Sequence, residues 1–344
     1  MDAQLLNTSS NIRLRRGLIV LAVLAVLLLL SIIVSLNTGH MKLAPLDTLR
    51  TLVGGGTDKE RLVLFQFRLP RIVLSVMVGA GLALSGCLIQ GVSRNALADP
   101  GLLGINAGAG LVVLLYLMLG GATTLLSIFT LPFLALAGGS ATAALIYMLA
   151  YKYGEGISTF RLIVTGVALQ AGIGSAMTVL VLKLDESEFD FLALWQAGSI
   201  WGSNWHYVLA LLPWLLAVIP YVMLKARSLD VLNLGDDRAG GLGLSVERER
   251  RKLLAAAVAL AASCMSVSGS ISFVGLIAPH LARRLVGGRH ALLLPASLLA
   301  GALLVSVADM VGRVFMHPDE IPTGLVVAVI GAPYFLYLLT KTDR

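Results

Sequence analysis

Charged side chains are scarce in this chain. Of its 344 residues only 13% are Asp, Glu, Lys or Arg, whereas 57% are hydrophobic. A soluble domain carries about 25% charged residues, and a globule that faces water on all sides needs such a surface to stay in solution. The composition therefore excludes a soluble globular protein and predicts an integral membrane protein.

Cysteine is nearly absent, and no linker or low-complexity segment interrupts the chain. Cys87 and Cys264 lie within apolar runs and far apart in sequence, so neither a disulfide framework nor a metal-ligand spacing follows from them. We expect no metal site and a single membrane domain over residues 1–344. The net charge of +7 comes from basic residues that punctuate the apolar runs instead of forming one patch, which argues against a nucleic-acid partner.

Apolar runs that are long enough, or nearly long enough, to cross a bilayer recur along the sequence. A helix needs about 20 mostly apolar residues to span the hydrocarbon core. The runs lie at 18–36, 72–92, 102–119, 125–151, 162–182, 208–224, 253–267, 274–285, 291–311 and 325–339. Small residues are frequent within them, and such residues mark the seams where membrane helices pack closely. The sequence predicts an all-α polytopic membrane protein, a compact bundle of about ten transmembrane helices.

Two of these runs, 253–267 and 274–285, are short and are separated by the small, polar Ser268-Gly269-Ser270. Irregular backbone is tolerated at membrane depth only where protein or a water-filled cavity shelters it. The break therefore indicates a pathway or a packed interior, not a surface that faces lipid.

The distribution of basic residues predicts the orientation. Arg13, Arg15 and Arg16 precede the first run, which has the length of a full span and is therefore expected to be an uncleaved helix, not a signal peptide. With this end inside and ten crossings, the inside connections carry 18 of the 26 Lys and Arg residues and the outside connections carry eight. The positive-inside rule then predicts that both termini are cytoplasmic. The outside segment 37–68 is an exception, because it holds most of the outside positive charge.

The segment 225–252 has a composition unlike that of a span. It is rich in charges and in small residues, which include Ala239, Gly240 and Gly243. Small side chains let the surface of another protein approach the backbone closely. The segment is either a cytoplasmic coupling loop or an ordinary solvated loop; its charge alone does not separate the two.

From about residue 68 to the C-terminus, the sequence contains a series of motifs that occur in the same order in a known protein family. They are Arg-Leu-Pro-Arg at 68–71, Asn-Ala-Leu-Ala-Asp-Pro at 95–100, Gly-x-x-x-Ala-x-x-Leu-Gly at 235–243, Gly-Leu-x-x-Pro-His-x-x-Arg at 275–283 and shorter matches at 294–295, 308–313, 320–324 and 331–333. In this order they resemble the FecCD family, the permeases of ATP-binding-cassette (ABC) importers for iron–siderophore complexes, haem and vitamin B12. Ala96 stands where the family usually has proline, which puts only a local turn in doubt.

The resemblance implies a division of labour. Two permease subunits, identical or homologous, would enclose the pathway in the bacterial inner membrane, and an external binding protein would deliver a ferric siderophore or similar metal chelate, with haem or cobalamin as the alternative. Two cytoplasmic ATPase subunits would grip the loop through Gly235, Ala239, Leu242 and Gly243. ATP and magnesium would bind there, because this chain has no Gly-x-x-x-x-Gly-Lys-[Ser/Thr] loop. We expect the chain itself to be no enzyme.

The resemblance also implies roles for two further sets of residues, one in docking of the binding protein and one in the cytoplasmic gate. Arg68, Arg71 and Arg313 match positions that receive acidic residues of the binding protein, and exposed guanidinium groups suit such docking. Alternatively, they anchor helix ends at the lipid headgroups. Ser158 and Thr159 match the cytoplasmic gate, although a simple helix cap is equally good physics.

Two other functions compete with the importer permease: a secondary transporter, for which Asp309 is relevant, and a membrane-embedded enzyme. An ion-driven secondary transporter usually carries ionisable residues at mid-membrane. Asp309 is the candidate, yet Arg313 follows it by four residues, so an intrahelical ion pair is the simpler expectation. A membrane-embedded enzyme would need clustered nucleophiles, bases or metal ligands within the spans, and the sequence offers no such cluster.

Overall fold

The predicted spans form helices in the computed structural model, which describes residues 2–38, 44–120, 127–152, 156–200, 202–315 and 320–342. The helices that coincide with the ten apolar runs are α1 Asp2–Asn37, α4 Leu69–Ser93, α5 Ile105–Met118, α6 Ser127–Ala150, α7 Thr159–Val181, α9 Trp205–Leu224, α12 Val246–Ser268, α13 Val274–Val286, α14 His290–Phe315 and α15 Thr323–Thr342. Within the described residues seven helices are long and apolar enough to cross a membrane. Helices α5, α13 and α15 are the shorter ones, so the all-α polytopic class is confirmed and the count of ten stays a prediction.

Short elements fill the connections between the spans. They are α2 Pro45–Leu52, α3 Asp58–Leu62, the π-helix η1 Val63–Arg68, the 3-10 helix η2 Pro100–Leu103, α8 Glu186–Ala197, α10 Ala226–Leu232, α11 Asp236–Gly241 and the strands β1 Tyr151–Lys152 and β2 Gly156–Ile157. The strands pair antiparallel, with Tyr151 opposite Ile157. The sequence contains a signal for the start of helix α8, because Asp185 and Glu188 form a reciprocal capping box there.

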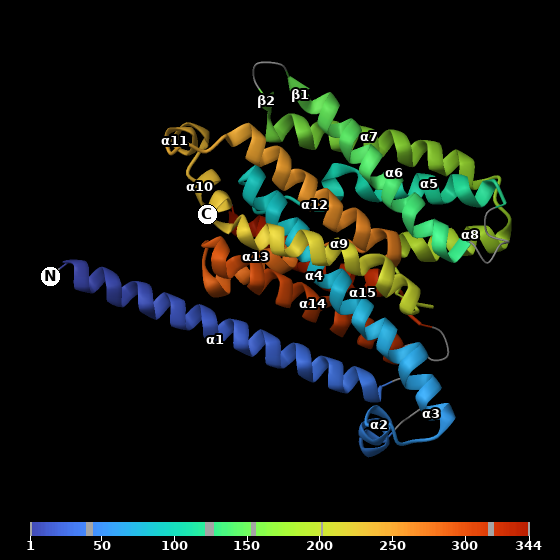
Figure 1. The fold of residues 1–344 in the computed structure, drawn as a ribbon. Helices are drawn as coiled ribbons and strands as arrows, with labels where there is room; N and C mark the ends of the chain where they lie inside the picture. Colours follow the sequence, from blue (N-terminus) through green and yellow to red (C-terminus); the bar gives the residue numbers. More distant parts are fainter. Residues whose placement is uncertain are drawn as a thin grey trace.

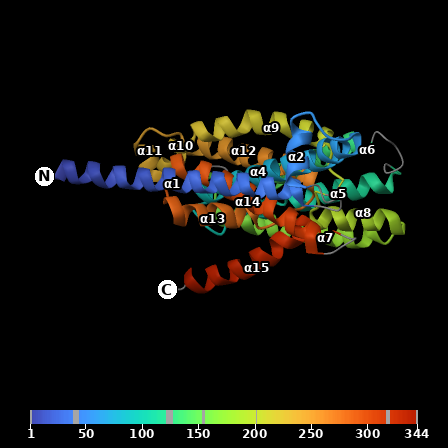
Figure 2. The ribbon, with the colours of Figure 1, turned by 90° about the horizontal axis from the view of Figure 1, so that it is seen from below.

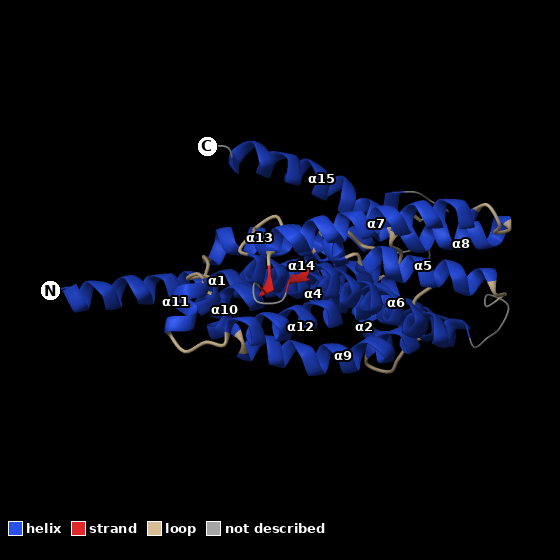
Figure 3. Ribbon diagram, turned by 90° about the horizontal axis from the view of Figure 1, so that it is seen from above, coloured by secondary structure: helices blue, strands red, loops and turns tan. Residues whose placement is uncertain are grey.

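The connections gather at two opposite ends of the bundle (Figure 1). One end, which we call the coupling end, carries the start of α1, the end of α15, α10, α11 and the strand pair. The other, which we call the opposite end, carries α2, α3 and α8. Views along the perpendicular direction agree (Figures 2 and 3). The predicted placement of both termini on the side of the 225–252 segment is therefore consistent with the fold.

Helices α4 and α12 form the centre of the bundle. In the most apolar stretch of each helix, 83% of the residues of the α4 span and 72% of those of α12 are buried, against 17% for both α1 and α7. Glycines make the close packing possible: a side chain at Gly79 would collide with the backbone of Gly301 in α14, and one at Gly86 with the backbone of Gly275 in α13. The predicted small-residue seams are thus present in the core.

The break after α12 lies in a packed interior. A side chain at Gly269, whose φ is +67°, would collide with the carbonyl of Trp195 at the end of α8, and the amide of Ser270 donates to the same carbonyl at 3.2 Å. One boundary in this region was predicted wrongly. Helix α12 begins at Val246, so residues 246–252 form its first turns and not part of a loop; charged residues suit a helix that emerges from the membrane.

Candidate functional site

A buried ion cluster lies near the opposite end of the bundle. Arg71 in the first turn of α4 donates through Nε to Asp309 of α14 at 2.8 Å and through Nη1 to Glu320 at 2.7 Å. The other oxygen of Asp309 lies 3.3 Å from Nε of Arg313, and Thr323 at the start of α15 donates its hydroxyl to Asp309 at 3.3 Å. Asp309 is only 1% exposed. One carboxylate thus joins α4, α14 and α15.

Further arginine contacts extend this cluster to α1. Arg68 is 5% exposed and Arg313 is 7% exposed. Arg68 donates to the carbonyl of Leu36, while Arg313 donates to the hydroxyl of Ser35 and, at 3.3 Å, to the carbonyl of Thr38. The guanidinium groups therefore satisfy the backbone at the end of α1.

The expectation of exposed guanidinium groups at Arg68, Arg71 and Arg313 is wrong. Apart from Asp309, which precedes Arg313 by four residues, their partners are distant in sequence, for example 249 positions for Arg71 and Glu320, so no local pattern indicated the burial. The intrahelical pair of Asp309 with Arg313 is confirmed. This pairing also weakens the main feature that favoured a secondary transporter, because a carboxylate in ion pairs with two arginines has a structural role in joining helices. A contact of these arginines with a binding protein stays a prediction.

The predicted coupling residues lie on and beside α11, a six-residue helix at the coupling end (Figure 1). Gly235 precedes it with φ +105° and Gly243 follows it with φ +84°, conformations that only glycine adopts without strain. Leu242 is 66% exposed, and a side chain added at Gly240 or Gly243 would meet open space. This part of α11 has the small, exposed surface that the sequence predicted.

Ala239 differs from its neighbours because its side chain points inward. It is completely buried, and its carbonyl accepts from the amide of Leu244 at 3.1 Å. A large residue at Ala239 would therefore displace α11 from its own chain before it met any partner. The exposed residues Gly240 and Leu242 are the better probes of a partner surface.

Ion pairs that the sequence did not predict fix this segment to the bundle. Asp236 at the first position of α11 pairs with Arg94, which follows α4, and with Arg250 of α12 at 3.0 Å. On α10, Asp230 accepts from the backbone amide of His290 at 2.9 Å and lies 2.7 Å from Nδ1 of that imidazole. Movements of α10 and α11 are thus linked to α4, α12 and α14.

The predicted gate residues lie at the start of α7. Ser158 holds the N-cap position with extended backbone angles, and its carbonyl accepts from the amide of Leu162 at 3.0 Å. Within the described residues its side chain makes no capping hydrogen bond to the first turn, so the simple cap does not explain this serine. Thr159 is the first residue of α7. The gate itself stays a prediction.

The segment between α4 and α5 keeps its turn although Ala96 replaces proline. The amide of Ala98 donates to the carbonyl of Asn95 at 3.2 Å, and the amide of Leu97 donates to the Asn95 side chain at 2.9 Å. Further on, Asp99 caps η2 by accepting from the amide of Gly101 at 2.7 Å. Gln170 of α7 donates to the Gly101 carbonyl at 2.6 Å, which joins this loop to α7.

Asp99 should make the stability of the protein depend on pH. Burial raises the pKa of its carboxyl group to about 6, above the ordinary value of about 3.9. The folded protein therefore binds a proton more readily than the unfolded chain, and stability falls as the pH rises from about 4 to 6 and then stays constant. We expect Asp99→Asn, which keeps the capping oxygen, to raise the melting temperature in detergent at pH 8 and to have a smaller effect at pH 5.

The matched control for this experiment is Asp237→Asn, which changes an exposed carboxylate at the coupling end and should leave the melting temperature unchanged at both pH values. Equal effects of Asp99→Asn at pH 5 and pH 8 would contradict the raised pKa. The full shift of about two pH units corresponds to at most about 3 kcal/mol.

The chain is a multi-pass helical bundle with glycines at its helix seams and an exposed helical element, α11, at one end. In a comparison with known proteins, the model of the FecCD transport family matches residues 27–341. The chain belongs to this family and is the permease subunit of an ABC importer.

The relatives share nearly the whole length of the chain. The iron(3+)-hydroxamate import system permease protein FhuG of Bacillus subtilis (strain 168) is 49% identical over 332 residues, which covers 95% of this chain and 98% of that protein. The hemin transport system permease protein HmuU of Yersinia pestis is 37% identical over 320 residues, covering 92% and 95%. A solved structure described as a metal-chelate type ABC transporter in an inward-facing conformation is 32% identical, with a TM-score of 0.82 over 93% of this chain and 98% of that one.

Proposed function

We propose that this chain acts as one transmembrane permease domain over residues 1–344 in a bacterial cell membrane, with both termini in the cytoplasm. The basic residues support this orientation, because the connections at the coupling end hold most of the Lys and Arg residues. The coupling end is then cytoplasmic, and the opposite end, with α2, α3 and α8, is external.

A second permease subunit, the same or homologous, would lie against α7. This helix is a candidate span of which only 17% is buried in its most apolar stretch. Its exposed face includes the small residues Ala168, Gly172 and Ser175, and Ser175 satisfies its hydroxyl by donating to the Ala171 carbonyl at 2.9 Å. Small residues whose polar groups form hydrogen bonds within their own helix suit close packing against another helix. They also suit a pathway that makes only weak contacts with its substrate. Ser158 and Thr159 at the cytoplasmic start of α7 would then form the gate of this pathway.

Two ATPase subunits in the cytoplasm would bind the 225–252 segment around α11, with Gly235, Ala239, Leu242 and Gly243 as the coupling residues, and would hold the ATP and magnesium. The movement that ATP hydrolysis drives in the ATPase subunits would be transmitted to the helices of the pathway through the ion pairs of Asp236 with Arg94 and of Asp230 with His290. On the external side a binding protein would dock near Arg68, Arg71 and Arg313. Arg71 and Glu320 retain 11% and 12% side-chain exposure, so this pair is the accessible edge of the cluster.

The substrate we propose is a ferric siderophore of the hydroxamate type. The observation that carries it is the 49% identity, over nearly the full length, with a permease whose name gives iron(3+)-hydroxamate. Haem is the second candidate, supported by the 37% identity with a hemin permease. A cavity of about 730 Å³, lined by residues of α8 and α12 and by Glu320, would offer room for a large chelate at the external end of the bundle.

Uptake by reconstituted vesicles tests this proposal. Proteoliposomes that contain the permease with its ATPase and binding protein should accumulate a ferric tris-hydroxamate complex when ATP is supplied, and should take up a ferric catecholate or haem at least about tenfold more slowly, a difference of about 1.4 kcal/mol. Vesicles without the ATPase serve as the control and should show no ATP-dependent uptake. Preferred uptake of haem would show that haem, and not a ferric hydroxamate, is the substrate. Full uptake without the ATPase would contradict the ABC mechanism.

A further inference from the structure

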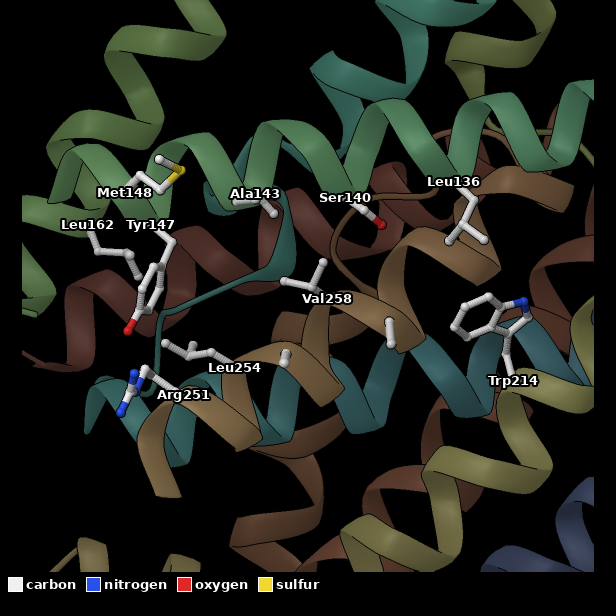
Figure 4. A pocket seen from close by; sticks show the side chains of 13 residues that line it. Leu136, Ser140, Ala143, Tyr147, Met148, Leu162, Trp214, Arg251, Leu254 and Val258 are labelled. Carbon is white, nitrogen blue, oxygen red and sulfur yellow. The ribbon is translucent and has the colours of Figure 1, made fainter. Parts of the chain in front are cut away.

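A groove on the side of the bundle opens between α6, α9 and α12 (Figure 4). Its volume is about 460 Å³, and its lining is mostly apolar. Small residues on two facing helices, Ser140 and Ala143 of α6 and Ala255 and Ala259 of α12, leave the space, while Leu136 and Trp214 wall its inner end. All three helices are candidate membrane spans, so the groove lies at membrane depth.

The groove has one polar end. Arg251 of α12 and Tyr147 of α6 lie together there, and the Tyr147 hydroxyl points toward Arg251 (Figure 4). This end is near the coupling end of the bundle, because Arg251 is in the second turn of α12. From Arg251 to Ala259 the helix rises about 12 Å, most of the depth of one leaflet of a hydrocarbon core about 30 Å thick.

Arg251 differs from the basic residues beside it. Arg250 contacts Asp236 at 3.0 Å, and Lys252 lies 3.7 Å from Glu249. Glu247, an acid beside the polar end of the groove, accepts from the Tyr147 hydroxyl at 3.5 Å and lies 4.0 Å from Arg250. Within the part of the chain that the structure describes, no carboxylate is in ion-pair contact with Arg251. Its exposed guanidinium group thus remains available to an anion at the head of an apolar groove.

We propose that this groove binds one anionic phospholipid of the cytoplasmic leaflet, with an acyl chain between α6 and α12 and the phosphate on Arg251. An acyl chain supplies the dispersion contacts that an empty groove would lose, and a guanidinium group holds a phosphate by paired hydrogen bonds. Basic pockets between transmembrane helices on the cytoplasmic side favour anionic headgroups. A second permease subunit is the poorer occupant, because it would bury Arg251 against a helix.

Native mass spectrometry of the delipidated permease in detergent tests this inference, with phosphatidylglycerol and phosphatidylcholine of identical acyl chains as probes. The wild type should retain one phosphatidylglycerol with a preference of about fivefold over phosphatidylcholine, the effect expected for one basic residue near a membrane surface. Arg251→Gln should remove the preference. Ala255→Phe, which fills the groove from an exposed position, should weaken the binding of both lipids.

The matched control is Arg289→Gln, which removes an exposed cytoplasmic arginine before α14 and should keep the preference. Equal binding of the two lipids by the wild type, or an unchanged preference in Arg251→Gln, would overturn the proposal. A disulfide cross-link between two copies that carry Ala255→Cys would also overturn it, since it would put a second subunit on the groove. None of these measurements depends on the transported substrate.

Discussion

Asp309→Ala should destabilise the permease strongly, by about 3–5 kcal/mol. The carboxylate is 1% exposed and lies between Arg71 at 2.8 Å and Arg313 at 3.3 Å. Without it Arg313 would lose its carboxylate partner in a buried site, and Arg71 would keep only Glu320. The expected readouts are a lower yield of folded protein from the membrane and a melting temperature in detergent that falls by at least several degrees.

Asp190→Ala is the control, because Asp190 is an exposed aspartate of α8 at the same end of the bundle; its melting temperature should match that of the wild type. An Asp309→Ala protein that melts like the wild type would mean that Arg71 and Arg313 do not need this carboxylate. The experiment therefore tests the structural role of the cluster.

Gly240→Trp should abolish ATP-dependent uptake while leaving the permease folded. Gly240 lies in α11, is exposed, and has open space where its side chain would be, so the indole would not disturb the chain itself. It would instead separate α11 from an ATPase subunit seated on it. Overpacking of a fitted contact costs about 1–3 kcal/mol, which corresponds to roughly five- to 150-fold weaker binding. Uptake in proteoliposomes and co-purification of the ATPase measure the two consequences.

Gly240→Ala is the matched control, since a methyl group keeps the close approach and should retain most of the uptake. Ala239→Trp should also abolish transport, but for a different reason: Ala239 is buried within the chain, and the variant would dislodge α11 and lower the melting temperature. If Gly240→Trp transports normally and still co-purifies with the ATPase, α11 is not the contact, and the coupling surface must lie elsewhere at the coupling end.

The sequence could predict those features that depend on local composition. All ten apolar runs became helices, because a chain in hydrocarbon must satisfy its backbone hydrogen bonds within each span. The small residues of the segment around Gly240 and the pair of Asp309 with Arg313 could also be predicted, since each depends on residues that are close together in the sequence. Helix α8 is absent from the predicted elements, although its capping box lies in the sequence. The predicted start of α12 is too late, because a helix can carry charged residues where it extends beyond the membrane.

Only the tertiary structure decided which of these residues face a partner. The charge and family position of Arg71 are visible in the sequence, but its carboxylate partners lie 238 and 249 positions away. The same holds for Ala239, whose inward direction depends on how α11 rests on the bundle. Composition and spacing determine which segments enter the membrane because each span meets the lipid requirement by itself. Burial of a charge depends on the packing of helices that are distant in sequence, and no local pattern records that packing.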